Sequence, residues 1–315
     1  VVITSLGLEV RNQQSRRVLI HWAQYFGIVL SLWLSTAGYS SRFDNDDVVH
    51  KTFWSLYGVG VLGILMHSTG DLTSTNSNFF ALFLSLIYFL LTLQWFRTGI
   101  HLPRCRFFCT IQGSIMLVYS LLALVASTAY YYPIQRRDNV FWVLCLGYPI
   151  EIFVTLLIQE LGMVFMYPHL DYEDARKEVD LPLHIQFHID RFKTLSMMVL
   201  GQLASAIAWH PEQGFGSVEG LYASAGCGFI SLVCLKIFIF DVDFLDTHDH
   251  AIRRSRCSGL TWLLLYPLAM GCLALTGSGV ALLIAEAGKI NSVPAGSPHF
   301  RQLLTCESLS VFLII

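Results

Sequence analysis

The chain has 315 residues, of which 54% are apolar and only 13% are charged. An ordinary soluble domain carries about 25% charged residues, so this composition argues against a water-soluble globular fold. The net charge of −2 arises from nearly equal numbers of acidic and basic residues. The clustered basic and aromatic residues of a nucleic-acid-binding surface are absent, so we expect no nucleic-acid partner.

Eight long apolar runs follow one another along the chain. A run of about 20 apolar residues predicts a membrane-spanning helix, because lipid offers no hydrogen bonds to an unpaired backbone. The predicted fold is therefore all-α, a polytopic transmembrane helix bundle. In chain order the predicted spans are Val18–Tyr39, Phe53–His67, Phe79–Ile100, Phe107–Tyr131, Val140–Phe165, Phe192–Trp209, Gly220–Phe240 and Gly259–Ala287.

These spans divide the chain into three parts. Residues 1–17 form an N-terminal juxtamembrane segment, residues 18–287 the transmembrane helical domain, and residues 288–315 a loop and the start of a ninth span. The first residue is not Met and the last residues stop inside an apolar run, so we expect a fragment at both ends. Lys and Arg are more frequent in loops on the side of Arg42 and Arg97, which predicts that this side is cytoplasmic.

Glu151 is the most informative single residue. It follows Gly147 and Pro149 and lies about eleven residues into the span Val140–Phe165, near the middle of the bilayer. A charge at that depth costs at least a few kcal/mol unless it is paired, protonated or hydrated, so an intramembrane carboxylate indicates a functional site. The alternative is a neutral glutamate that is hydrogen-bonded between helices.

The segment His184–Gln202 (HIQFHIDRFKTLSMMVLGQ) changes from charged to apolar along its length. On a helix, Arg191 and Gln202 share one face about 16 Å apart, because eleven residues make three turns plus roughly 20°. His188 and Asp190 belong to the charged beginning. The layout predicts a cavity lining that leads inward from the membrane boundary. The two histidines, four residues apart, also match a metal-binding spacing, but ordinary interfacial histidines are the simpler interpretation.

Asp and His residues cluster in the segment Phe240–His250 (FDVDFLDTHDH). Such a group suits a hard cation or a proton buffer at a pore mouth, and a solvated acidic loop is the alternative. The glycine and glutamate spacing of a calcium loop is absent. We therefore expect neither a metal site nor a cofactor in this protein.

Gly58–Gly63 reads GVGVLG, which formally matches a dinucleotide-binding fingerprint. That fingerprint requires a preceding strand and an acidic residue about 20 residues later, and neither is present here. We interpret these glycines as positions where two helices approach closely.

Three patches of the chain carry a family resemblance. They are Trp33–Tyr39 followed by Arg42–Asp47 (WLSTAGY and RFDNDD), His188–Phe192 through Leu200–Gln202 (HIDRF and LGQ), and Phe238–Asp241 (FIFD). Together they resemble the low temperature requirement A (LtrA) family, and the loops are more similar to its fungal members.

The resemblance implies a multi-pass membrane protein in a family without an established biochemical activity. Its members usually carry Glu at the positions of Asp190 and Gln202 and open with a helix that bears a Phe-Phe-Asp element. That element is missing here, which agrees with a truncated N-terminus. An amide cannot titrate, so a proton-carrying role for Gln202 is not expected.

The favoured hypothesis is a transporter or channel for a small solute, an ion or a proton within the lipid bilayer. The candidate residues are Glu151 as a proton or cation site, Arg191, Gln202, His188 and Asp190 as a lining, and Arg42, Asp44, Asp46 and Asp47 as a cytoplasmic network. Two alternatives stay open at this point. One is a membrane-embedded, metal-dependent enzyme that acts on lipid with the Phe240–His250 cluster, and the other is a non-catalytic scaffold or sensor.

Overall fold

The structure is a computed structural model. It describes residues 16–43, 47–68, 76–128, 134–169, 183–208, 218–241 and 250–287, with single positions between 171 and 181. Within these residues every regular element is helical and no strand occurs, which confirms the predicted all-α class. The chain divides into two compact units, one of residues 23–188 and one of residues 1–22 with 189–315.

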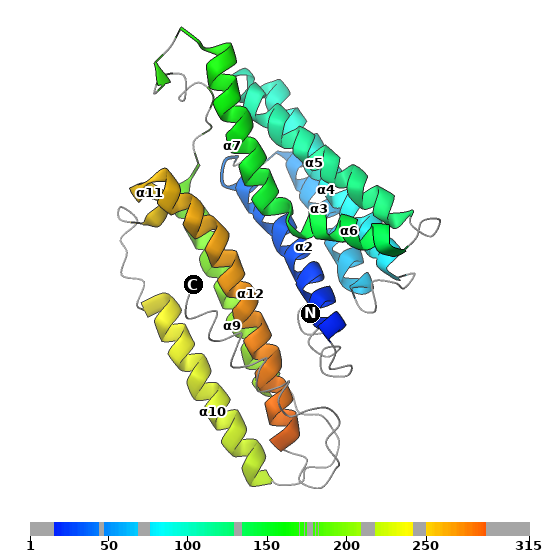
Figure 1. The fold of residues 1–315 in the computed structure, drawn as a ribbon, viewed down its shortest axis with the longest axis vertical. Helices are drawn as coiled ribbons and strands as arrows, with labels where there is room; N and C mark the ends of the chain where they lie inside the picture. The colour runs from blue at the N-terminus through cyan, green and yellow to red at the C-terminus, as the bar shows by residue number, and fades with distance from the viewer. Residues whose placement is uncertain are drawn as a thin grey trace. The chain divides into compact units, whose positions relative to one another are not determined.

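The unit of residues 23–188 is built from successive helices (Figure 1). They are α2 (Arg16–Ser40, which begins in the other unit), α3 (Val48–His67), α4 (Asn76–His101), the short 3-10 helix η1 (Pro103–Cys105), α5 (Arg106–Ser127), α6 (Ile134–Cys145) and α7 (Gly147–Met166). The second unit contains α10 (Val218–Lys236), the π-helix η3 (Ile237–Asp241), α11 (Ala251–Arg254), α12 (Arg256–Ala287) and most of α9 (Ile185–Ala208).

Five segments of the described part are long and apolar enough to cross a membrane. The protein is therefore a multi-pass membrane protein by the length and composition of its helices. These segments are Val48–His67, Ser77–His101, Pro103–Ser127, Gly147–Phe165 and Cys257–Val280.

The predicted span Val140–Phe165 is wrong as a single helix. The chain breaks at Leu146 between α6 and α7, and Figure 1 shows α6 turning away from the axis of α7. Pro149 explains the break, because a proline ring clashes with the carbonyl four residues earlier, here that of Cys145. In the first turn of α7 the same proline is tolerated, since the N–H groups there have no helical partner.

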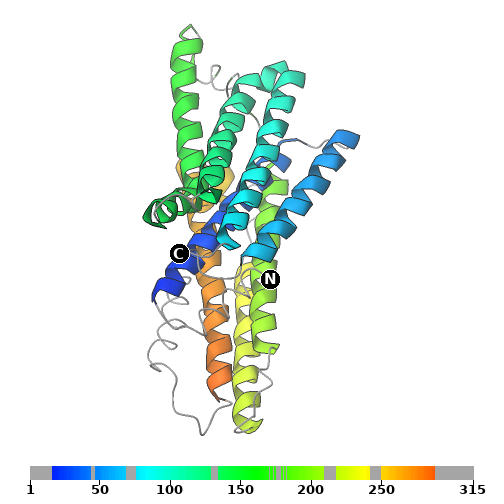
Figure 2. The same ribbon diagram turned by 90° about the vertical axis from the view of Figure 1, so that its right-hand side faces the viewer.

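Helices α4 and α5 lie side by side in the core of the first unit (Figures 1 and 2). Their contact includes the rings of Tyr88 and Tyr119, whose centroids are 5.5 Å apart. Ser85 and Ser120 tie the same two helices together, since each hydroxyl donates to the other residue's backbone carbonyl at 2.9 and 3.0 Å. The hydrogen-bonding groups of the two serines are thus paired with each other and need no water, which the interior of a membrane does not supply.

Helices α9, α10 and α12 run alongside one another in the second unit (Figure 2). α12 is one continuous helix that holds Pro267. Aromatic rings join α9 to α12, with Phe192 and Trp262 at 4.7 Å between centroids. The buried face of α9 in this unit is mainly apolar, as expected of a helix that packs on neighbours along one stripe, and it also holds the buried Ser196.

Candidate functional site

Glu151 lies in the fifth position of α7 and is only 8% exposed. The Ser35 hydroxyl of α2 donates a hydrogen bond to its carboxylate at 2.5 Å. A buried carboxylate in an apolar helix is unfavourable unless donors or positive charge compensate it. Ser35 supplies one such donor, so the acid is held in a defined position between two helices.

The residues around Glu151 include tyrosines of α4 and α5. Its charge interacts with Tyr88 and Tyr119, and Tyr88 is the twelfth residue of the 25-residue span Ser77–His101. The Tyr119 hydroxyl donates to the carbonyl of Gly147 at 2.7 Å. Glu151 itself is the fifth residue of the span Gly147–Phe165, because its helix starts later than predicted, and its position near the middle of the bilayer stays a prediction.

Arg42 follows the end of α2 and is half-buried. Its guanidinium donates to the Gly38 carbonyl at 2.8 Å and lies 5.0 Å from the ring centroid of Phe108. The positive charge acts on both Glu151 and His188. Arg42 therefore interacts electrostatically with the buried Glu151 carboxylate. The sequence pattern did not indicate this pairing.

Asp47 has a different role at the boundary of the same unit. It forms a salt bridge with Arg97 of α4 and caps α3 by accepting from the backbone N–H of His50 at 2.6 Å. The hydrogen bond from Arg97, followed by that from His50, holds the pKa of Asp47 below its ordinary value. Asp44 and Asp46, the other acids of the predicted cytoplasmic network, lie outside the described residues.

Of the residues predicted on α9, His188 joins the surroundings of Arg42. His188 is 3% exposed, and just before it the His184 backbone N–H donates to the Ser41 carbonyl at 3.1 Å. Asp190 and Arg191 have exposed side chains. Gln202 is half-buried, and its side-chain oxygen lies in the interior without a hydrogen-bond partner. The stripe predicted from helical periodicity thus has a buried histidine and an exposed arginine.

Several polar neighbours of Glu151 were not singled out from the sequence. They are Ser35, Tyr88, Tyr119 and Tyr148. Each is a single polar residue within or beside an apolar run. Its distance from Glu151 along the chain does not show whether the two side chains meet in the fold. The one available signal is local, since Tyr148 precedes Glu151 by three residues and shares its helix face.

The comparisons with known proteins give one result. A family model described as "Bacterial low temperature requirement A protein (LtrA)" matches residues 1–315. The chain belongs to the LtrA family. No curated protein and no solved structure shows significant similarity to it.

In this LtrA protein the first family-like patch contributes directly to the buried site. Trp33–Tyr39 lies on the second half of α2 and contains Ser35, the donor to Glu151. The next residue, Thr36, shares a 2.9 Å hydrogen bond with the Tyr57 hydroxyl of α3. Adjacent positions of one short motif therefore bind to two different helices.

Metal chemistry has no support among the residues that the structure describes in this LtrA protein. No group of three or more His, Cys, Asp or Glu side chains is arranged there to hold an ion. Most of the Phe240–His250 cluster, residues 242–249, lies outside the described ranges. The alternative of a metal-dependent enzyme acting on lipid stays a prediction, which metal analysis of the purified protein would test.

Proposed function

We propose that this LtrA protein is a membrane transporter or channel for a small solute or ion, with Glu151 as its proton- or cation-binding group. The observation that carries the proposal is the buried Glu151 carboxylate, hydrogen-bonded to Ser35 and under the charge of Arg42. The family match supports the membrane setting and leaves the transported species open.

The physical argument rests on the cost of charge inside a membrane. An ionised carboxylate at this depth costs at least a few kcal/mol unless it is compensated, and Arg42 provides compensation. When a proton or cation binds Glu151, the attraction between Glu151 and Arg42 weakens. The two ionic states of Glu151 therefore favour different positions of α2 and α7, which is the requirement for coupling binding to movement.

The remaining predicted site residues form the outer part of the same proposal. On α9, Arg191 and Gln202 are proposed as lining residues, with His188 and Asp190 at the charged beginning of that helix. Eight helices span the membrane in this proposal, with α2, α9 and α10 added to the five most apolar segments.

The test is a flux measurement on the purified chain in liposomes. A trapped pH-sensitive dye reports proton movement, and a panel of ions and small solutes identifies the cargo. We expect Glu151→Gln to abolish coupled flux, whereas Glu160→Gln, the same chemical change nine residues later on α7, retains it. Arg191→Ala is expected to lower flux, since it removes a charge at the route's entrance.

Unchanged flux in Glu151→Gln would remove this residue from the mechanism. Unchanged flux in Arg191→Ala would remove the proposed lining. Glu160 is a suitable control because it is half-buried and accepts a hydrogen bond from the Tyr172 hydroxyl at 3.2 Å. A general loss of folding caused by neutralising a glutamate on α7 would affect both glutamate variants.

A further inference from the structure

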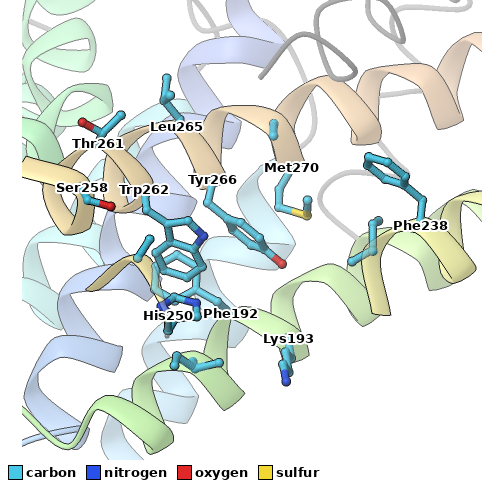
Figure 3. Close-up of a pocket in the computed structure, with 14 residues that line it drawn as sticks. Phe192, Lys193, Phe238, His250, Ser258, Thr261, Trp262, Leu265, Tyr266 and Met270 are labelled. Atoms are coloured by element: carbon cyan, nitrogen blue, oxygen red, sulfur yellow. The ribbon is translucent and has the colours of Figure 1, made fainter. Parts of the chain in front are cut away.

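A pocket of about 540 Å³ lies within the second unit (Figure 3). Its lining residues come from α9, η3, α11 and α12 and from the cap of α11. Small-molecule sites usually occupy about 300–1,000 Å³, so the pocket has the size of a binding site. It shares no lining residue with the surroundings of Glu151.

One wall of the pocket is a continuous aromatic surface. The ring centroid of Trp262 lies 4.7 Å from Phe192, 4.7 Å from His250 and 4.8 Å from Tyr266. The hydroxyls of Tyr266 and Ser196 are hydrogen-bonded, which orients the Tyr266 ring. The wall is therefore rigid and largely apolar.

The π-helix η3 contributes a further apolar part of the lining. It follows α10 directly and brings Phe238 and Ile239 to the pocket. The Phe238 side chain is 53% exposed, so it offers apolar surface to a ligand in the pocket. π-helical turns are rare and often occur at functional sites, because they redirect side chains that an α-helix would place elsewhere.

Polar side chains make up a small part of the described lining. Lys193 is exposed and lines the pocket, and no Asp or Glu occurs among the described lining residues. Ser258 and Thr261 add hydroxyl groups at one end, whereas Met270 and Phe238 lie at the other end (Figure 3). The described lining is mainly apolar and carries a lysine, which favours an anion with an apolar part over a cation or a fully polar solute.

One end of the pocket lies at the start of a candidate membrane span. The span Cys257–Val280 begins one residue before Ser258, and Trp262 follows within the next two turns. Trp and Tyr are enriched where lipid headgroups meet the acyl chains. An anionic amphiphile at this level has its charge among the headgroups and its apolar part in the hydrocarbon.

We propose that this pocket binds an anionic phospholipid. Lys193, at the rim of the pocket on α9, attracts the phosphate. The first part of an acyl chain packs on the aromatic wall and on Phe238. A phospholipid is favoured over a soluble phosphate because most of the lining offers apolar contact and no further charge.

Native mass spectrometry of the full chain in a neutral detergent tests the proposal. Phosphatidylglycerol and phosphatidylcholine with identical acyl chains are titrated against wild type, Lys193→Ala, Lys193→Arg and Lys51→Ala. We expect wild type to prefer phosphatidylglycerol and Lys193→Ala to bind it about fivefold more weakly, as expected for one basic residue near a lipid surface. Lys193→Arg restores binding, and Lys51→Ala, which changes an exposed lysine of α3, leaves it unchanged.

Equal retention of the two phospholipids by wild type would overturn the proposal, as would an equal loss in Lys193→Ala and Lys51→Ala. Oleate forms a separate arm. If oleate displaces phosphatidylglycerol at equal concentration, the pocket is a fatty-acid site and the phospholipid assignment is wrong. Because Lys193 is exposed, its replacement leaves the packed core intact, and an unchanged unfolding temperature verifies this.

Discussion

The Ser35 hydroxyl and the Glu151 carboxylate are hydrogen-bonded at 2.5 Å, although 116 residues separate them in the chain. The contact joins α2 to α7 within the first unit. The Ser35 hydroxyl is a hydrogen-bond donor, so it stabilises the Glu151 oxygen as an acceptor. The proposed transport function and the stability of this helix pair therefore depend on the same two atoms.

Removing the donor is the most direct test of this contact. Ser35→Ala leaves a buried carboxyl oxygen without its partner, which costs about 1–3 kcal/mol of stability. In the Glu151→Gln background the same replacement costs less, because an uncharged amide oxygen needs the donor less strongly. Denaturant unfolding in detergent micelles of the four members of this double-mutant cycle should give a coupling of at least about 0.5 kcal/mol.

Ser40→Ala is the matched control for Ser35→Ala. The Ser40 hydroxyl donates only to backbone carbonyls of its own helix, at Thr36 and Ala37. It should show no coupling to Glu151→Gln. Strictly additive free energies for Ser35→Ala and Glu151→Gln would mean that their hydrogen bond does not contribute to stability.

The salt bridge between Asp47 and Arg97 makes stability depend on pH. Because the folded-state pKa of Asp47 lies below its unfolded value, its contribution is fully present above about pH 4, the ordinary aspartate range, and is lost as pH falls through the lower folded-state pKa. Asp47→Asn should therefore be less stable than wild type at pH 6, and the difference should shrink as the solution is acidified. Thermal unfolding across this range measures it.

Asp171→Asn serves as the comparison for Asp47→Asn. Asp171 is exposed and has the same side chain, but it lies outside the helices. A stability difference between wild type and Asp47→Asn that stays constant from pH 6 to below pH 3 would contradict a role for the ionised carboxylate.

Two glycines of GVGVLG, Gly58 and Gly63, have different surroundings, so we expect opposite effects of replacing them with alanine. A Cβ at Gly63 would lie 2.4 Å from the Phe83 ring, whereas a Cβ at Gly58 would have no atom within 4 Å. Gly63→Ala should destabilise the contact between α3 and α4 by about 1–3 kcal/mol, the usual cost of overpacking. Gly58→Ala should be neutral or slightly stabilising, because alanine favours the helix. Equal melting temperatures for the two variants would be inconsistent with close packing at Gly63.

Tyr119 supports the break between α6 and α7. Its hydroxyl donates to the Gly147 carbonyl at 2.7 Å, so Tyr119→Phe should lose about 1 kcal/mol of stability. Tyr88→Phe is the control, because Tyr88 packs on Tyr119 at 5.5 Å between ring centroids and its hydroxyl does not bond to the Gly147 carbonyl. If both replacements reduce the unfolding temperature equally, the Gly147 contact is not responsible.

Hydrophobic runs alone were sufficient to predict the all-α class, the membrane setting and most helix positions. Each is a property of one segment, because transfer from water to lipid depends on that segment's own composition. The close contacts at Gly60 and Gly63 also followed from local sequence, whereas the same expectation was wrong at Gly58, where a Cβ would have no atom within 4 Å. Family motifs on α2 and α9 were sufficient for the resemblance that the full-length match confirmed.

Tertiary packing alone decided which polar groups meet. The sequence assigned Arg42 to a cytoplasmic network, but its half-buried charge acts on Glu151. The partner of Asp47 is Arg97, which lies 50 residues later in the chain. The rotation of each helix about its axis sets these pairs, and apolar residues on neighbouring helices determine that rotation. Helical periodicity places Arg191 and Gln202 on one face, but it does not determine which neighbours cover that face.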